Sequence, residues 1–287
     1  MKDASHSLQQ THSLDTNDKL SKQNQGAATF ALNALTLSQN GNVRNQEDTW
    51  RTIENGTNGT AVYRLLVQDS SHNGRPVSPW NNVPLFASNS NLQVVCKSPR
   101  GTWVELELAQ EESNCPLRVR LSDDRLIHFS HNSAWNICML PQTYGDPDLP
   151  NMNYGGLPYN GAEVEVVDLG TDTRRPGEVY TVKALGGFVV IDLETGSISW
   201  KILAIALDDS MAGMLHDASD IHWKLPGELE QVREWLRIRH CTHAGENRNR
   251  TFRPLRAIGV VGNWCTACLS HSETRLVDRC STIVLKS

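Results

Sequence analysis

The sequence has little of what membrane-spanning, nucleic-acid-binding or disulfide-rich proteins require. Its apolar runs all stay well short of the roughly 20 residues that cross a bilayer. The net charge is −5, so there is no basic excess to indicate a nucleic-acid partner. Seven cysteines in 287 residues are few and odd in number, which disfavours a disulfide framework and favours a reducing compartment. We therefore expect a cytoplasmic protein without membrane or nucleic-acid partners.

Targeting signals and common hydrolase motifs are also missing. The N-terminus has neither the basic region nor the apolar region of a secretory signal. A mitochondrial transit peptide is the alternative, disfavoured because Asp3, Asp15 and Asp18 are acidic and the first arginine is Arg44. There is no phosphate-binding P-loop and no G-x-S-x-G nucleophile motif. Any phosphate chemistry therefore needs another kind of site.

Composition divides the chain near residue 58. Residues 1–58 are rich in Ser, Thr, Asn, Gln and Asp and have little periodic apolar character. Such a segment buries too little apolar surface to offset the entropy of ordering. We predict a disordered tail, with a short helix over 27–37 as its one candidate element, that can be removed without unfolding the rest.

Beyond this segment the pattern is typical of short strands. β-rich runs alternate with glycine or polar turns, over residues 62–67, 103–108, 117–121, 164–169, 179–185, 188–192 and 199–207. Leu225, Leu229, Val232 and Leu236 recur at helical spacing around Pro226, which suits the first turn of a helix. Many short strands and one amphipathic helix predict a closed barrel with a helix packed on it.

An ordered series of motifs runs through residues 60–250. It consists of G-R-P-V-S-P-W (74–80), V-P-L-F-A (83–87), P-R (99–100), L-P-Q-T-Y-G-D-P (140–147), V-K-A-L-G-G (182–187), S-W-K-I-L (199–203) and L-P-G-E-L-E-Q-V-R-E-W-L-R-I-R (225–239). The series resembles the eukaryotic family I soluble inorganic pyrophosphatases. The resemblance implies a mainly β fold with flanking α-helices, built on an OB-like five-stranded barrel. It places this domain over 59–252, with an irregular tail over 253–287.

The resemblance also implies an activity. The family hydrolyses pyrophosphate with Mg²⁺ ions held by carboxylates, while Lys, Arg and Tyr side chains contact the phosphates. Its D-x-D-P-x-D signature falls here on Asn160, Ala162, Glu163 and Glu165. Ala162 stands at the position of the water-activating Asp, and Ser199 replaces another Asp. Because Mg²⁺ prefers anionic oxygens, we predict that ordinary Mg²⁺-dependent hydrolysis is lost or very weak.

Charge is inverted at two further positions. Lys97 stands where the family has a metal-linked Glu, and Glu105 where it has a phosphate-binding Lys. If these two side chains face each other across the barrel mouth, a salt bridge between them would lie where substrate phosphate would otherwise bind.

Other positions keep their charge. The carboxylates of a weak or vestigial metal site would be Glu107, Glu165 and Asp192, with Asp146 beside them. The resemblance places phosphate contacts at Lys201, Arg239 and His240. Two interpretations stay open: polar strand residues inherited from an ancestor, or a reduced site holding one Mg²⁺.

Three functional classes stay open. The chain acts on a diphosphate or another phosphorylated small molecule, or it is a non-catalytic binding or regulatory module, or its barrel serves a biosynthetic pathway. A homodimer, or a heterodimer with an active paralogue, is expected around Trp80, Phe86 and Trp135. Cys265 and Cys268, followed by a histidine, have the spacing of half a zinc site, but a second pair of ligands is not evident.

Overall fold

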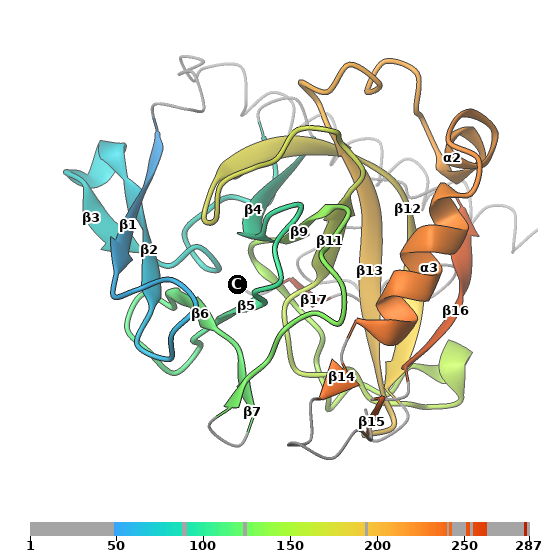
Figure 1. Ribbon diagram of the computed structural model, residues 1–287, viewed down its shortest axis with the longest axis horizontal. Coiled ribbons are helices and arrows are strands. Elements are labelled where there is room, and N and C mark those ends of the chain that lie inside the picture. The colour runs from blue at the N-terminus through green and yellow to red at the C-terminus, as the bar shows by residue number, and fades with distance from the viewer. Residues whose placement is uncertain are drawn as a thin grey trace, which may run out of the picture. The chain divides into compact units, whose positions relative to one another are not determined.

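A closed ring of five strands forms the centre of the structure (Figure 1). The strands are β4 (Leu92–Ser98), β9 (Asn136–Met139), β11 (Glu165–Asp168), β12 (Val179–Asp192) and β13 (Ser197–Ala206). They pair in the order β13-β11-β9-β4-β12, and β12 pairs again with β13. This confirms the predicted five-stranded, OB-like barrel.

The computed structural model describes residues 49–87, 91–122, 125–192, 195–239, 241–242, 251–252, 255–262 and 284–285. His240, the candidate zinc ligands Cys265 and Cys268, and the expected helix over 27–37 lie outside these residues. No described helix is long and apolar enough to cross a membrane.

One long strand links the halves of the barrel. The sequence predicts separate strands over 179–185 and 188–192, whereas β12 runs through both with a register shift between Ala184 and Gly186. Its first part pairs with β4 and its last part with β16 (Leu255–Gly262). Because a bulge adds one residue, it changes which side chains face inward: Tyr180 and Val182 before it, Val189 after it.

A second sheet covers one outer face of the barrel and appears blue to green in Figure 1. Its path is β1-β2-β6-β5, with β3 paired to β2. The bounds are β1 (Trp50–Asn55), β2 (Arg64–Asp69), β3 (Arg75–Val77), β5 (Leu106–Leu108) and β6 (Leu117–Val119). β1 lies within the segment 1–58 that composition assigns to a tail, so strand structure extends further toward the N-terminus than the sequence indicates.

Two helices cover another outer face. Asp217 caps α2 (Ala218–Lys224) by accepting hydrogen bonds from two backbone N–H groups, and α2 was not expected from the sequence. The predicted helix is α3 (Glu228–Ile238), which starts after Gly227 at φ 86°, so Pro226 precedes the helix instead of opening it. Trp235 of α3 packs edge-on against Phe129, with ring centroids 5.2 Å apart.

Short elements complete the described chain. They are β7 (Leu121–Ser122), β8 (Arg125–Leu126), β10 (Thr143–Tyr144), β14 (Cys241–Thr242), β15 (Thr251–Phe252), β17 (Val284–Leu285) and the 3₁₀ turns Ser70–His72 and Met152–Tyr154. β16 and β17 fall in the segment 253–287, where the sequence predicts an irregular tail. β16 instead extends the barrel sheet as a sixth strand beside β12.

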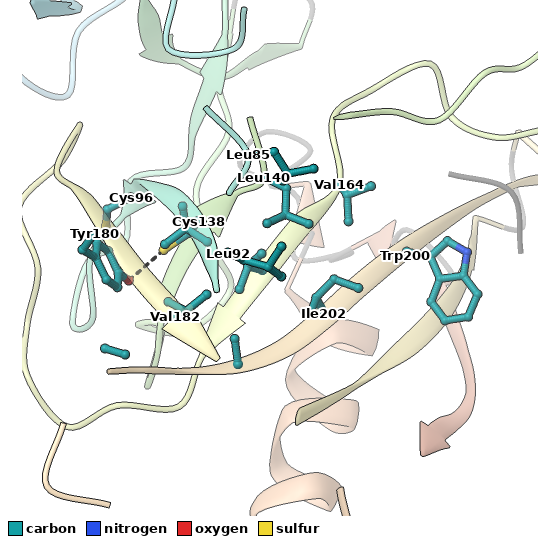
Figure 2. Close-up of a cluster of buried hydrophobic side chains, with 14 of the residues drawn as sticks. Leu85, Leu92, Cys96, Cys138, Leu140, Val164, Tyr180, Val182, Trp200 and Ile202 are labelled. Carbon is teal, nitrogen blue, oxygen red and sulfur yellow. Dashed lines mark hydrogen bonds between the residues drawn. The ribbon is translucent and has the colours of Figure 1, made fainter. Parts of the chain in front are cut away.

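Alternation along the strands separates the apolar core from the polar site. On β13, Ile202 and its even-numbered neighbours face the barrel interior, where Leu92 and Leu140 meet them (Figure 2). The odd-numbered Leu203 and Ile205 pack under the helices. Lys201 lies on this same outer face, nearer the start of the strand. The polar residues of several barrel strands therefore gather on one outer surface.

Candidate functional site

A polar cavity of about 290 Å³ lies where the barrel strands, β5 and the end of α3 meet. Nine of its lining side chains carry charge: Lys97, Glu105, Glu107, Arg120, Glu163, Glu165, Asp192, Lys201 and Arg239. Asn160, Ala162 and Ser199 line it as well. The structure thus brings together nearly all of the site positions that the sequence singles out.

Glu165 stands at the centre of this cavity and is only 4% exposed. Its carboxylate contacts Arg239 (Nη2 to Oε2, 3.1 Å), Lys201 (Nζ to Oε1, 3.4 Å) and Lys97 (Nζ to Oε2, 3.6 Å). Burial by itself would raise the pKa of Glu165, but the three cations outweigh burial and hold this pKa well below its usual range. Glu165 is therefore a carboxylate already neutralised by the protein.

Lys97 bridges two carboxylates. Its Nζ lies 2.8 Å from Oε1 of Glu163 and 3.6 Å from Oε2 of Glu165. Burial would lower the pKa of Lys97, yet the charges of these two carboxylates raise it above its ordinary value. The ion pairs of Lys97 are thus with Glu163 and Glu165, whereas the inverted charges in the sequence pointed to Glu105. Glu105 is paired with Arg120 (2.9 Å) and with Arg239 (3.8 Å).

A second set of ion pairs joins the small sheet to the same network. Glu107 and Arg118 are register partners on β5 and β6, with Nε of Arg118 3.0 Å from Oε1 of Glu107. Arg120 reaches both Glu105 and Glu107, at 2.9 and 3.8 Å. Sequence reasoning missed Arg118 and Arg120 as members of the site. The available signal was the alternation of two glutamates on one run and two arginines on the next.

Lys201 differs from Lys97 in the direction in which its pKa is shifted. Burial, together with the charges of Arg239 and Lys97, lowers the pKa of Lys201 to about 8 even though Glu165 opposes this shift. Lys97 has two carboxylates close by, whereas Lys201 shares one carboxylate with two other cations. Lys201 is therefore the cation of the cavity that most readily gives up its proton near neutral pH.

Two further expectations need correction. Asp146 is not among the residues that line the cavity, and its Oδ1 accepts a hydrogen bond from the backbone N–H of Asp148. Trp80 and Trp135 are 4% and 3% exposed, and Phe86 packs against the barrel interior, so these aromatic residues belong to the core and do not mark an interface. Trp80 also donates its indole N–H to the carbonyl of Thr143 at 2.7 Å.

The ion pairs of the cavity limit the number of carboxylates that could bind a metal ion. Within the described part of the chain, no group of three or more His, Cys, Asp and Glu side chains is arranged to hold a metal ion. Asn160 offers a neutral oxygen and Ala162 none. The carboxylates of Glu105, Glu107, Glu163 and Glu165 all contact lysine or arginine.

Comparison with known proteins relates this barrel to the inorganic pyrophosphatases. The family model of inorganic pyrophosphatase matches residues 94–255. Soluble inorganic pyrophosphatase 1, chloroplastic, of Chlamydomonas reinhardtii is 33% identical over 184 residues, covering 64% of each chain. The inorganic pyrophosphatase of Zygosaccharomyces bailii is 30% identical over 197 residues, covering 66% of this chain and 67% of the other.

Solved structures agree with the sequence comparison. The type I inorganic pyrophosphatase from Toxoplasma gondii matches with a TM-score of 0.61 and 29% identity, over 66% of this chain and 82% of that one. The chain spans 64% and 60% of the length of the chloroplastic relatives from Chlamydomonas reinhardtii and Arabidopsis thaliana. It belongs to the inorganic pyrophosphatase family.

Proposed function

We propose that this member of the family does not hydrolyse pyrophosphate by the Mg²⁺-dependent route and that its barrel serves as a non-catalytic binding module. The observation that carries the proposal is the pairing of Glu165 with Lys97, Lys201 and Arg239 inside the cavity. These protein cations stand among the carboxylates that would otherwise receive metal ions.

The donor set does not fit Mg²⁺. This ion requires nearly octahedral oxygen ligands at about 2.0–2.1 Å, usually including one or two carboxylates that are free to coordinate. To reach Glu165, a metal ion would have to displace a buried ammonium or guanidinium group. Breaking a buried ion pair typically costs about 3–5 kcal/mol, because one charge is left uncompensated. Asp192 lines the cavity as well, as do Asn160 and Ser199, whose side chains are neutral.

The reaction also needs a base to activate water. General-base catalysis typically contributes about 10²–10⁴ in rate, and Ala162 at the expected position has no group that accepts a proton. Loss of the base and of metal-held charge stabilisation together supports a rate near background, although such effects are not additive.

The ligand class that we propose is a small phosphorylated molecule, such as a diphosphate, by analogy with the substrate of the family. Lys201 is the cation with the weakest pairing, and Ser199 and Asn160 offer neutral hydrogen-bond donors along the same wall. A phosphate group has acceptor oxygens for all three. Such binding would need no metal ion.

Phosphate release by the full-length protein tests the catalytic half of this proposal. The substrates are pyrophosphate and organic diphosphates, each with Mg²⁺ and with EDTA, beside the Chlamydomonas reinhardtii relative as a positive control. We expect background rates of phosphate release from this protein with every substrate, both with Mg²⁺ and with EDTA. Turnover faster than about 1 s⁻¹, a rate ordinary for enzymes, that is abolished both by EDTA and by Asp192→Asn would restore an enzymatic function.

Titration with inorganic pyrophosphate in EDTA tests the binding half. We expect saturable binding that Lys201→Gln weakens at least tenfold. The matched control is Lys183→Gln on the neighbouring strand, because the Lys183 ammonium donates to the carbonyl of Ala212 and does not line the cavity. An absence of binding, or an equal loss in both variants, would reject the binding module.

A second candidate is proton-transfer chemistry in a biosynthetic pathway. The observation in its favour is Lys201, whose pKa of about 8 suits a general base in a cavity that also contains Ser199. Labelling of lysines with an amine-reactive reagent between pH 6 and 10 would distinguish it. Modification of Lys201 with a midpoint near pH 8 is expected; an ordinary lysine midpoint would remove the candidate.

Assembly and compartment stay predictions. A homodimer or a pairing with an active paralogue is proposed on family resemblance, and a cytoplasmic location on cysteine content. Sedimentation at micromolar concentration, alone and with an active paralogue, tests the first; a single monomeric species in both experiments would contradict it.

A further inference from the structure

Two cysteines face each other inside the barrel, on the side of the strands opposite to the cavity. Cys96 of β4 and Cys138 of β9 are direct register partners in an antiparallel pair. Both are 0% exposed and belong to the interior cluster drawn in Figure 2. Both are free thiols. The two thiols therefore lie on the same face of neighbouring strands, as a cross-strand disulfide requires.

Backbone hydrogen bonds define the type of this pair. The N–H of Cys96 donates to the carbonyl of Glu178 at 2.9 Å, and the carbonyl of Cys96 accepts from Gly177 N–H at 2.8 Å. Both backbone groups of Cys96 are therefore directed away from β9. Opposed residues of this non-hydrogen-bonded kind have Cα atoms about 4.5 Å apart. Disulfides span Cα separations of about 4.4–6.8 Å, so the strands need not move for a bond to form.

A hydrogen-bonded tyrosine orients one of the thiols. The hydroxyl of Tyr180 donates to Oδ2 of the fully buried Asp168 at 2.8 Å. Because its proton is used there, the Tyr180 oxygen accepts from the thiol of Cys138, 3.0 Å away (Figure 2). The lone pairs of the Cys138 sulfur are then available on the side of Cys96. Burial, and the neighbouring Cys138 thiol, raise the pKa of Cys96.

We propose that Cys96 and Cys138 are an oxidisable dithiol that forms a disulfide between β4 and β9. With a small disulfide such as oxidised glutathione, one cysteine thiolate attacks it, forms a mixed disulfide and releases one glutathione thiolate. The second cysteine thiolate attacks the mixed disulfide and releases the other. The protein loses two electrons and two protons, and the oxidant becomes two reduced glutathione molecules.

Burial sets the rate of this exchange and the lifetime of its product. The thiolate is the reacting species, and it is rare in a dry interior where the thiol pKa is raised. Exchange therefore occurs while the barrel folds or opens locally, and the closed barrel then shields the bond from reductants. The bond would join β4 to β9 at Cys96, the residue before Lys97. On β9, Cys138 precedes Met139, which is the register partner of Glu165, so the bond would lie behind the ion pairs of the cavity.

The test uses full-length protein refolded with reduced glutathione alone or with a mixture of oxidised and reduced glutathione. Free thiols are then alkylated, and trypsin digestion is followed by mass spectrometry. We expect a disulfide linking the peptides 65–97 and 126–174 after refolding with the mixture and not after refolding with reduced glutathione alone. Native protein exposed to the same mixture should form it at least tenfold more slowly. Recovery of Cys96 and Cys138 as alkylated thiols after oxidative refolding would overturn the proposal, and this readout requires no variant.

Thermal unfolding supplies the second readout. A cross-link closing this loop should raise the unfolding midpoint by roughly 5–10 °C relative to the reduced protein. The shift should vanish in Cys96→Ala and in Cys138→Ala. It should persist in Cys115→Ala, the matched control, because Cys115 is a free thiol packed in a different cluster. A shift that survives in Cys96→Ala and Cys138→Ala would also overturn the proposal.

Discussion

The two faces of the barrel strands bury different kinds of side chain, apolar ones toward the interior and paired ions on the outer face. On the interior face, Ile202 and Val166 pair across β13 and β11 and pack with other apolar side chains. One position earlier on both strands, Lys201 and Glu165 pair on the outer face and are buried as ions. The first solution needs only complementary volume, whereas the second needs every charge to have its partner. The fold is therefore specified on one face and the chemistry on the other, which lets the chemistry change while the barrel persists.

Neutralising the central carboxylate should have the largest effect. Glu165→Gln leaves three buried cations around an amide, so we expect a loss of about 3–5 kcal/mol in the free energy of unfolding. Ile202→Ala on the interior face should lose a similar amount, about 2–5 kcal/mol, through a cavity. Urea unfolding measures both losses, and the pH dependence of stability described below separates the two variants. A loss below about 1 kcal/mol for Glu165→Gln would mean that the network is not buried as described.

The two lysines of the cavity should differ in a second, smaller way. Lys97→Met leaves Glu163 without its lysine partner and removes one of the three cations around Glu165, so we expect a loss of about 3 kcal/mol or more. Lys201→Met removes a cation already disfavoured by burial and by its neighbours, so its change should stay within about 1 kcal/mol. Equal losses in chemical unfolding would contradict the proposed difference in how strongly the two lysines are held by their neighbours.

Much of the fold, but less of the site, was predictable from the sequence. The motif series and the alternating runs predicted the barrel and α3, because local periodicity and fixed motifs carry that information. α2 has only seven residues and little apolar repetition, and the pairing of β16 with β12 is a long-range contact that no local pattern encodes. Most of the predicted site positions line one cavity, yet the ion-pair partners of Lys97 could not be predicted, because the reach of a side chain across a cavity depends on strand register.

The dependence of the unfolding free energy on acidic pH should distinguish the ionic outer face from the apolar interior face. Cations beside Glu163 and Glu165 hold the pKa of both carboxyls below the ordinary value against the effect of burial. Their contribution to stability is complete above the unfolded pKa of about 4.3 and is lost as the pH falls through the folded pKa values. We expect the unfolding free energy to fall below about pH 4 in the wild type and in Ile202→Ala. Glu165→Gln should show a shallower fall; identical profiles would contradict the pairing.

The smallest expected effect concerns carboxylates introduced at three positions of the cavity wall. A variant combining Asn160→Asp, Ala162→Asp and Ser199→Asp should still release phosphate from pyrophosphate at the background rate. Lys97 and Arg239 would remain in contact with Glu165 and oppose metal binding. Adding Lys97→Glu and Glu105→Lys should be required for any recovery. Metal-dependent turnover in the triple variant alone would show that the cations do not block the site.

Binding of Mg²⁺ tests the central claim most directly, since it asks whether protein cations have taken the place of the metal ions. The measurement is calorimetric titration of the full-length protein with Mg²⁺, in parallel with Asp192→Asn, which removes the carboxylate at the cavity wall. We predict no saturable heat for the wild type and a trace that Asp192→Asn leaves unchanged. Saturable Mg²⁺ binding to the wild type that disappears in Asp192→Asn would contradict the account.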